Sequence, residues 1–165
     1  MKMSKFVLFV ILFLLWLLLT WTFNYQDVTI GLILSLFIAI LMGDIFTEHP
    51  GKFKDIKRYL WMIAYIPYFF WYCILANFDV AYRVLHPKMP IKPGIVKVKT
   101  NLKSDAGRTF LANSITLTPG TLSVDIAAKE GIIYVHWIDV RSQDKEKATR
   151  LIVSRFEKIL KKVFE

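Results

Sequence analysis

Histidine is the first residue type to consider for chemistry in this sequence, and the chain has three. They are His49, His86 and His136. None of them has a second histidine or a cysteine at the spacing that zinc ligands usually show. The seven glycines are scattered and form no phosphate-binding loop. We therefore expect no metal and no cofactor.

A nucleophilic triad can be drawn from Ser123, Asp125 and His136, which fall on two neighbouring predicted strands. Ser123 and Asp125 alternate with apolar residues, however, and that period-2 pattern is typical of the solvent face of a strand. This structural interpretation is the better one. We expect no catalytic residues and no enzyme activity in this chain itself.

Ion conduction through lipid would need ionisable side chains at membrane depth. Asp27, Asp44, Glu48 and Asp79 all lie at the ends of apolar segments, where water or lipid headgroups reach them. Asp44 and Asp79 are candidates for acids at a subunit interface, and ordinary helix-end acids are the alternative. We do not expect the chain to conduct ions alone.

Composition points to a membrane protein. The chain has 165 residues, 55% of them hydrophobic, a mean hydropathy of +0.44 and a formal net charge of +9. Residues 1–78 hold 6 Lys and Arg, whereas residues 79–165 hold 16. On a membrane protein such basic residues usually attract anionic lipid headgroups, so we expect anionic lipids as partners and no nucleic acid. The single Cys73 excludes an internal disulfide.

The first two apolar runs predict a helical hairpin. Residues 6–26 carry no charge, and the bulky residues that follow Leu19 argue for a retained helix over a cleaved signal peptide. The second run, residues 28–43, has sixteen uncharged residues, or about 24 Å of helix, which is short for a bilayer core of about 30 Å. We therefore expect local bilayer thinning or neighbouring proteins to cover its ends.

The third run, residues 59–78, is rich in Tyr and Trp and contains Pro67. Lys and Arg number two before the first run, none in residues 24–27, four in 44–58 and four in 79–98. A spanning hairpin followed by a third segment that stays on one side would keep every basic stretch on the cytoplasmic side. We favour this arrangement, with a cytoplasmic C-terminal domain, and an ordinary third crossing remains the alternative.

The rest of the chain predicts a small basic α+β domain of order β-α-β-β-α. The strands are expected near residues 95–100, 122–126 and 132–138, and the helices from Ser104 toward Leu117 and from Asp144 to the C-terminus. The expected domains are a membrane domain 1–85 with segments about 6–23, 28–46 and 59–85, a Pro-rich linker 86–94, and the basic domain 95–165.

One motif resembles a known family. Residues 111–125, LANSITLTPGTLSVD, resemble the signature of the MnhE/MrpE family, which are subunits of Mrp-type multisubunit Na⁺/H⁺ antiporters. Residues 76–80, 90–95 and 134–137 resemble the same family. The resemblance implies an accessory subunit in a complex whose larger subunits carry the ion paths. Similar subunits occur in antiporter modules of membrane-bound hydrogenases and sulfur-reducing complexes, and the sequence does not separate these settings.

The resemblance brings no catalytic residues with it. It implies a structural role, at a helix end and turn, for the motif residues Asn113, Thr116, Thr118, Pro119 and Gly120. We expect a non-catalytic assembly subunit, multi-pass in the cell membrane, bound to other antiporter-type subunits. The alternative from another class is a free-standing membrane-tethered module that binds anionic lipid or nucleic acid.

Overall fold

The computed structural model describes residues 3–46 and 55–165, and it divides into two compact units between Asp55 and Ile56. Among the described residues, three helices are long and apolar enough to cross a membrane. They are α1 (Met3–Thr20), α2 (Tyr25–Phe46) and α3 (Ile56–Leu85). The first two form one unit, and α3 belongs to the other.

The α1–α2 hairpin is closed by hydrogen bonds to Asp27. The Trp16 indole Nε1 donates to the Asp27 carbonyl oxygen (3.0 Å), and the Thr22 hydroxyl donates to the Asp27 carboxylate (2.8 Å). This carboxylate lies in the first turn of α2, where the helix dipole favours a negative charge. Helix α2 has 22 residues, about 33 Å, so the expectation of a helix too short to span was wrong. The backbone stays helical through both charged ends.

Small residues at every fourth position of α2 face α1. Gly31, Ser35, Ala39 and Gly43 are all buried there. A Cβ atom added at Gly31 would lie 2.3 Å from Cδ1 of Trp16, so the indole occupies the space that a larger residue would need. Such small-residue stripes let two helices approach closely in a membrane.

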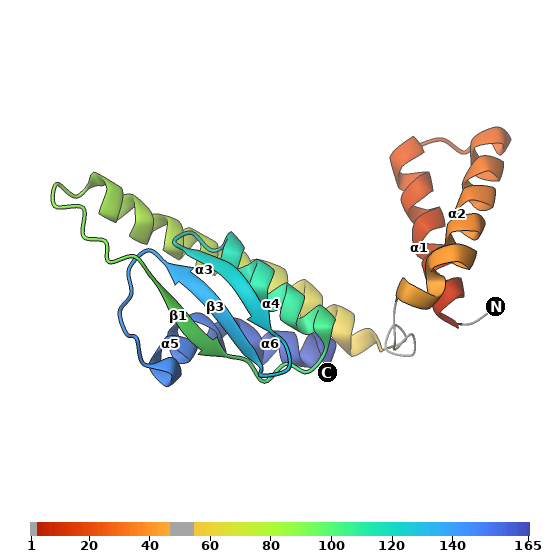
Figure 1. Ribbon diagram of the computed structural model, residues 1–165. Helices are drawn as coiled ribbons and strands as arrows, with labels where there is room; N and C mark the ends of the chain where they lie inside the picture. Colours follow the sequence, from red (N-terminus) through yellow and green to blue (C-terminus); the bar gives the residue numbers. More distant parts are fainter. Residues whose placement is uncertain (1–2, 47–54) are drawn as a thin grey trace. The chain divides into compact units, whose positions relative to one another are not determined.

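The second unit contains a three-stranded antiparallel sheet of order β1-β3-β2, with helices on one face (Figure 1). Val96 of β1 and Ser123 of β2 both pair with Val135 of the central strand. The elements are β1 (Gly94–Lys99), β2 (Thr121–Ala127), β3 (Ile132–Trp137), α4 (Asp105–Leu117), α5 (Lys145–Ile152) and α6 (Ser154–Phe164).

The two expected helix starts, Ser104 and Asp144, are both N-caps. The Ser104 hydroxyl accepts from the Gly107 amide, and the Asp144 carboxylate accepts from the Lys147 amide. The last helix differs from the prediction because it is two helices, α5 and α6, which divide at Val153. The division lets α5 pack on β1 while α6 packs on α4 and α3.

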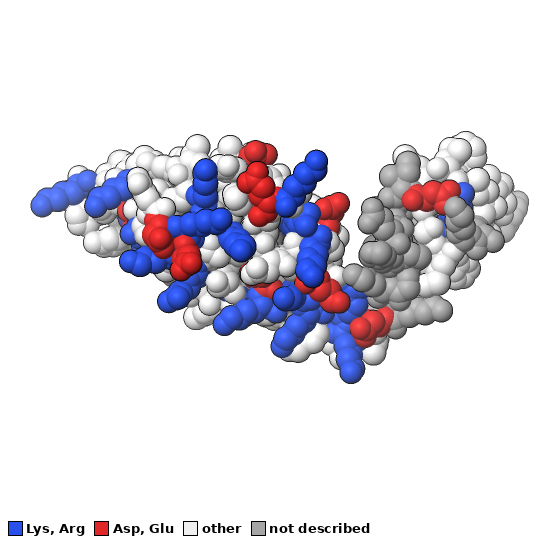
Figure 2. All heavy atoms as spheres, turned by 60° about the horizontal axis from the view of Figure 1, so that its bottom comes forward, with Lys and Arg blue, Asp and Glu red and all other residues white. Residues whose placement is uncertain are grey.

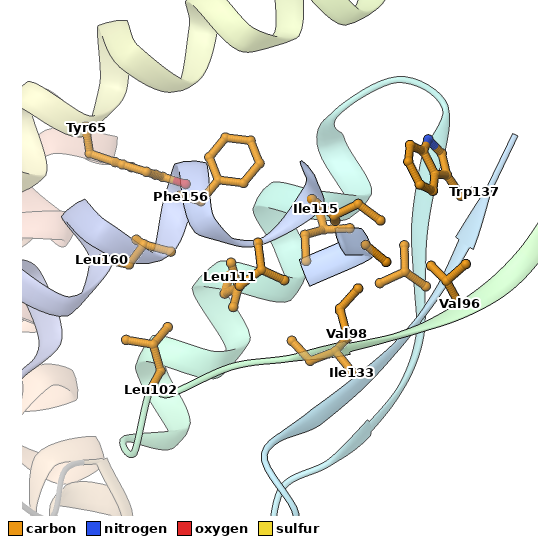
Figure 3. Packing of buried hydrophobic residues seen from close by; sticks show 14 residues of the cluster. Tyr65, Val96, Val98, Leu102, Leu111, Ile115, Ile133, Trp137, Phe156 and Leu160 are labelled. Carbon is orange, nitrogen blue, oxygen red and sulfur yellow. The ribbon is translucent and has the colours of Figure 1, made fainter. Parts of the chain in front are cut away.

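The core of this unit lies between the sheet and its helices, and α3 contributes to it (Figure 3). Phe156, Leu111, Ile115 and Ile133 are buried together, and Tyr65 of α3 joins them. The expected division at linker 86–94 therefore differs from the observed one. The aromatic residues of α3 cover Phe156, so this helix packs with the domain instead of standing apart from it.

Candidate functional site

The aromatic face of α3 is the surface on which the domain is assembled. Tyr65, Phe69 and Tyr72 each place a ring 5.8–6.5 Å from the ring of Phe156 on α6. Residues 65, 69 and 72 are three or four apart, so they share one side of the helix. The side-chain spacing of α3 thus fixes which side of it the domain covers.

Two tyrosine hydroxyls anchor this face. The Tyr65 hydroxyl lies 2.5 Å from the Ser114 hydroxyl of α4, and the Tyr68 hydroxyl donates to the Arg155 carbonyl oxygen of α6 (2.9 Å). A buried tyrosine needs such a partner for its hydroxyl. Helix α3 is therefore joined to two different helices of the domain by polar as well as apolar contacts.

Two cations of α6 lie over aromatic rings of α3. The Lys162 ammonium lies 3.8 Å from the ring centroid of Trp61, and the Arg155 guanidinium lies 5.3 Å from that of Tyr72. Within the described parts of the chain, no carboxylate lies within ion-pair distance of either cation. Burial lowers the pKa of Arg155, but a guanidinium remains charged at neutral pH.

A network of two acids and two arginines joins the end of α3 to the segment after β3. The Arg83 guanidinium contacts the Asp79 carboxylate (3.0 Å) and the Asp139 carboxylate (3.0 Å), and Arg141 contacts both acids (3.3 and 3.4 Å). Arg83 also donates to the Pro90 carbonyl oxygen (2.6 Å). Asp79, expected as an interface acid, thus has internal partners.

Asp44, the other expected interface acid, lies near the end of α2. Its carboxylate contacts the Lys5 ammonium of α1 at 3.0 Å, and Lys5 also donates to the Ile40 carbonyl oxygen. The Asp44 side chain remains 49% exposed. The contact joins the two helices of the hairpin at the end opposite to Asp27.

The motif residues lie where α4 turns into β2. Thr118 caps the helix through its hydroxyl, which donates to the Ser114 carbonyl oxygen, and the Thr116 hydroxyl accepts from the Ser123 amide. Pro119 is half-buried in the turn, and Gly120 has φ +88°, a conformation that favours glycine. Asn113 is exposed on α4.

The structure separates the residues of the possible triad. Ser123 pairs with Val135, whose side chain is buried on the helix-covered face, and the Ser123 hydroxyl donates to the Ala112 carbonyl oxygen of α4. The expectation that Ser123 lies on the solvent face was therefore wrong, because Leu122 and Val124 are the exposed residues of β2. His136 is the next residue on β3, so it points to the opposite face of the sheet. These two side chains cannot share a proton, which excludes the triad.

Sequence reasoning missed three features that the structure brings forward. The small residues at 31, 35, 39 and 43 could have been found from their spacing of four. Tyr65 and its neighbours could have been found as an aromatic stripe with a period of three or four. The placement of Arg155 and Lys162 over rings of α3 has no signal in the sequence, because it depends on tertiary packing.

The outward face of α3 is bare and, apart from Asn77, mostly apolar. Ile63, Ile66, Phe70, Ile74 and Phe78 are 47–72% exposed, and they recur every third or fourth residue opposite the aromatic face. Exposed apolar residues in such a continuous row are unusual for a surface in water. Figure 2 shows, by contrast, Lys and Arg side chains spread over the face of this unit that it brings forward.

Comparison with protein families shows a match along nearly the whole chain. A family model, MNHE, described as a Na⁺/H⁺ ion antiporter subunit, matches residues 9–163. A Na⁺/H⁺ antiporter subunit of the E type from Alkalihalophilus pseudofirmus is 41% identical over 143 residues, which cover 86% of each chain. A Na⁺/H⁺ antiporter subunit of the E1 type from Staphylococcus epidermidis is 35% identical over 98% of each chain.

A solved structure shares the fold. A chain of the membrane-bound sulfane sulfur reductase, an archaeal respiratory membrane complex, matches with a TM-score of 0.85 and 46% identity. The match covers 98% of this chain and 99% of that one. The likeness therefore extends over both compact units of the protein.

Proposed function

Because the chain belongs to the MnhE family of Na⁺/H⁺ antiporter subunits, we propose that it is a non-catalytic assembly subunit of a multisubunit membrane complex. The complex is a cation/proton antiporter or the antiporter-like module of a respiratory complex. The observation that carries this proposal is the amount of bare apolar surface on three long helices that hold almost no ionisable groups at depth.

The hairpin supports a packing role over an ion path. Lys5, Asp27 and Asp44 are the charged residues of α1 and α2, and all three lie near helix ends. A proton or sodium path needs ionisable groups near the middle of the membrane, and residues 28–43 supply none. The ion path is therefore proposed to lie in partner subunits.

The respiratory setting has its own support. The chain is 46% identical to the protein of the sulfane sulfur reductase complex, compared with 41% for the antiporter subunit from Alkalihalophilus. Since the two values are close, both settings stand as candidates. Co-purifying proteins distinguish them, because a respiratory complex adds metal-cluster subunits to the antiporter-like ones.

We also propose that only the hairpin crosses the membrane. The middle of α3 is covered by the domain at Tyr65 and Tyr72, and the adjacent Arg155 is charged. A charged domain attached along the middle of a crossing helix would have to enter the hydrocarbon, at a cost of several kcal/mol or more. The domain, with α3, would then lie on the cytoplasmic side, where the basic stretches favour it.

The test is purification of the full chain, tagged at its C-terminus, from its own membranes in a mild detergent. We expect large polytopic antiporter-like subunits in the same complex, identified by mass spectrometry. A tagged unrelated membrane protein of similar size controls for non-specific recovery. A stable lone monomer that exchanges Na⁺ for H⁺ in liposomes would contradict the assembly role.

A further inference from the structure

The outward face of α3 requires a cover other than water. From Ile63 to Phe78 the apolar row extends for about 22 Å along the helix. On the described parts of the chain the domain packs only on the opposite side of α3, at Tyr65 and its neighbours. A continuous apolar row of this length marks a surface for lipid or for another protein.

The flank of α3 that faces α6 changes character in a regular order. At about 100° per residue, Trp71 and Tyr82 lie between the bare apolar row and the line of Trp61, Tyr72 and Asp79. Trp71 and Tyr82 are 59% and 60% exposed. Moving around the helix, the surface is first apolar, then a band in which Trp71 and Tyr82 alternate with the exposed Ala64 and Leu75, and then cationic.

The cations on this flank follow the length of the helix. Lys162 lies over Trp61, Arg155 over Tyr72, and Arg141 beside Asp79. The first two contact points are eleven residues apart, about 16 Å, and the next is about 10 Å further on. Lys162 and Arg155 have no acidic partner among the described residues. Lys162 is exposed, whereas Arg155 is half-buried and also donates to the Leu151 carbonyl oxygen, so Lys162 offers the more accessible charge to an anion.

This order of layers matches a bilayer surface. Apolar side chains lie at the acyl chains, Trp and Tyr favour the headgroup boundary, and Lys and Arg bind phosphates. An interfacial helix buries its apolar face by about 5–10 Å into that boundary. A helix that crosses the bilayer among lipids would present apolar side chains on every side. Helix α3 does not, because the domain covers one side of it.

We propose that α3 lies parallel to the membrane surface and binds anionic phospholipid headgroups. Its apolar row lies in the acyl boundary, while Arg155 and Lys162 contact lipid phosphates. The proposal rests on the proposed function, because it assumes that the chain is part of a membrane complex. It adds a separate role, headgroup binding, for the flank of α3. The domain would then face the water with its sheet turned away from the bilayer.

The depth of α3 is measured with spin labels on the full chain within its complex in vesicles of 70% zwitterionic and 30% anionic phospholipid. Single cysteines replace Ile63, Phe70 and Phe78 in a Cys73→Ser background. The depth of each label follows from how strongly dissolved oxygen relaxes it compared with a water-soluble nickel chelate. We expect all three labels at one shallow depth. Lys97→Cys on the open face of the sheet is the water-exposed control.

Two other outcomes would overturn the proposal. A depth that changes steadily from position 63 to position 78 and passes the bilayer centre would show a crossing helix. Labels that neither reagent reaches would show that a partner protein covers the face. Recovery of the intact complex in either case would leave the assembly role standing, so the two failures are distinguishable.

The headgroup contacts are tested by cross-linking to a photoreactive anionic phospholipid. Lys162→Gln should lower the cross-linking yield about fivefold, and Lys162→Arg should restore it, because the charge is retained. Lys97→Gln is a matched control, since Lys97 also lies over an aromatic ring, that of Tyr134, but on the sheet. Equal yields for Lys162→Gln and Lys97→Gln would overturn the headgroup contact.

Discussion

The hydroxyl of Tyr65 on α3 lies 2.5 Å from the hydroxyl of Ser114 on α4, and both groups are buried. The two residues are 49 positions apart in the chain. The contact joins an apolar helix, long enough to cross a membrane, to the interior of a basic domain. It means that the domain and the helix share one core, so a change in this contact should alter both.

The first prediction concerns Tyr65. Tyr65→Phe should lower the free energy of unfolding of the domain by about 1 kcal/mol, since Ser114 keeps its bond to the Phe110 carbonyl oxygen. Tyr65→Ala should lower it by about 3–5 kcal/mol, because a large buried ring is removed. The measurement is the temperature at which the domain loses protease resistance in membranes.

Tyr82 provides the control for this prediction. Its ring is 60% exposed, so Tyr82→Phe should leave the protease resistance unchanged. If Tyr65→Ala behaved like Tyr82→Phe, the packing of α3 on the domain would not hold in the membrane.

The second prediction concerns Arg83, whose side chain is 10% exposed and contacts two carboxylates. Arg83→Gln should cost about 1.5–3 kcal/mol, because Asp79 and Asp139 lose their buried partner and keep only the exposed Arg141. Adding Asp139→Asn to this variant should recover part of the loss, since one of the two acids that then share only Arg141 is removed. The same protease assay gives both values.

Arg108→Gln is the comparison for Arg83. Arg108 pairs with Asp105, whose side chain is 89% exposed, so water screens the pair. The loss should be about 1 kcal/mol, most of it from the bond that Arg108 donates to the Leu102 carbonyl oxygen. Similar losses for Arg83→Gln and Arg108→Gln would contradict a structural role for the network at the end of α3.

Much of the fold follows from local sequence signals. The alternation around Val96 and Val98, the turn at Gly131 and the caps at Ser104 and Asp144 are all present as local patterns, and each corresponds to an observed element. The division at Val153 has no such signal. It arises because the apolar side chains of α5 pack on β1, whereas those of α6 pack on α3 and α4. Only the tertiary structure determines these partners.

The candidate site was less predictable, for a physical reason. Residues 59–78 read as one hydrophobic run, and hydropathy does not distinguish a side chain covered by Phe156 from one that faces lipid. The aromatic stripe at Tyr65 and Tyr72 contains this information only in its spacing. The partner cations Arg155 and Lys162 come from a helix about 90 residues further along the chain.

The third prediction concerns Gly31 in the hairpin. Gly31→Ala should lower the stability of the hairpin by about 1–3 kcal/mol, because the new methyl group overlaps the Trp16 ring. The displaced indole would also lose its hydrogen bond to the Asp27 carbonyl oxygen. The readout is the temperature at which the detergent-solubilised complex aggregates.

Ile30→Ala is the neighbouring control, because the Ile30 side chain is 49% exposed, whereas Gly31 is buried against α1. It should shift the aggregation temperature much less than Gly31→Ala. The reverse order would mean that close helix contact does not stabilise the hairpin.

The fourth prediction concerns the turn after α4. Gly120→Ala should cost about 1–2 kcal/mol, because φ is +88° and an added Cβ atom would lie 3.0 Å from Cγ2 of Ile138. Asn113→Ala, on the exposed side of α4, should be neutral or slightly stabilising because alanine favours helix. Protease resistance of the domain compares the two variants, and equal losses would contradict a special role for the turn.

The fifth prediction concerns the side of the membrane on which the domain lies. In a Cys73→Ser background, a cysteine at Asn24 lies between α1 and α2, and one at Lys145 lies at the start of α5. If only the hairpin crosses, an impermeant maleimide added to intact cells should label position 24 and leave position 145 unlabelled. The reason is that the turn at 24–27 carries no Lys or Arg, whereas the domain is basic.

Lysis of the cells should make position 145 react as fast as position 24, because Lys145 is exposed on the domain. This step controls for burial of the site in the complex. Labelling of position 145 in intact cells would place the domain outside. If position 24 were labelled as well, α3 would have to cross the membrane, and its aromatic face would have to leave Phe156 to do so.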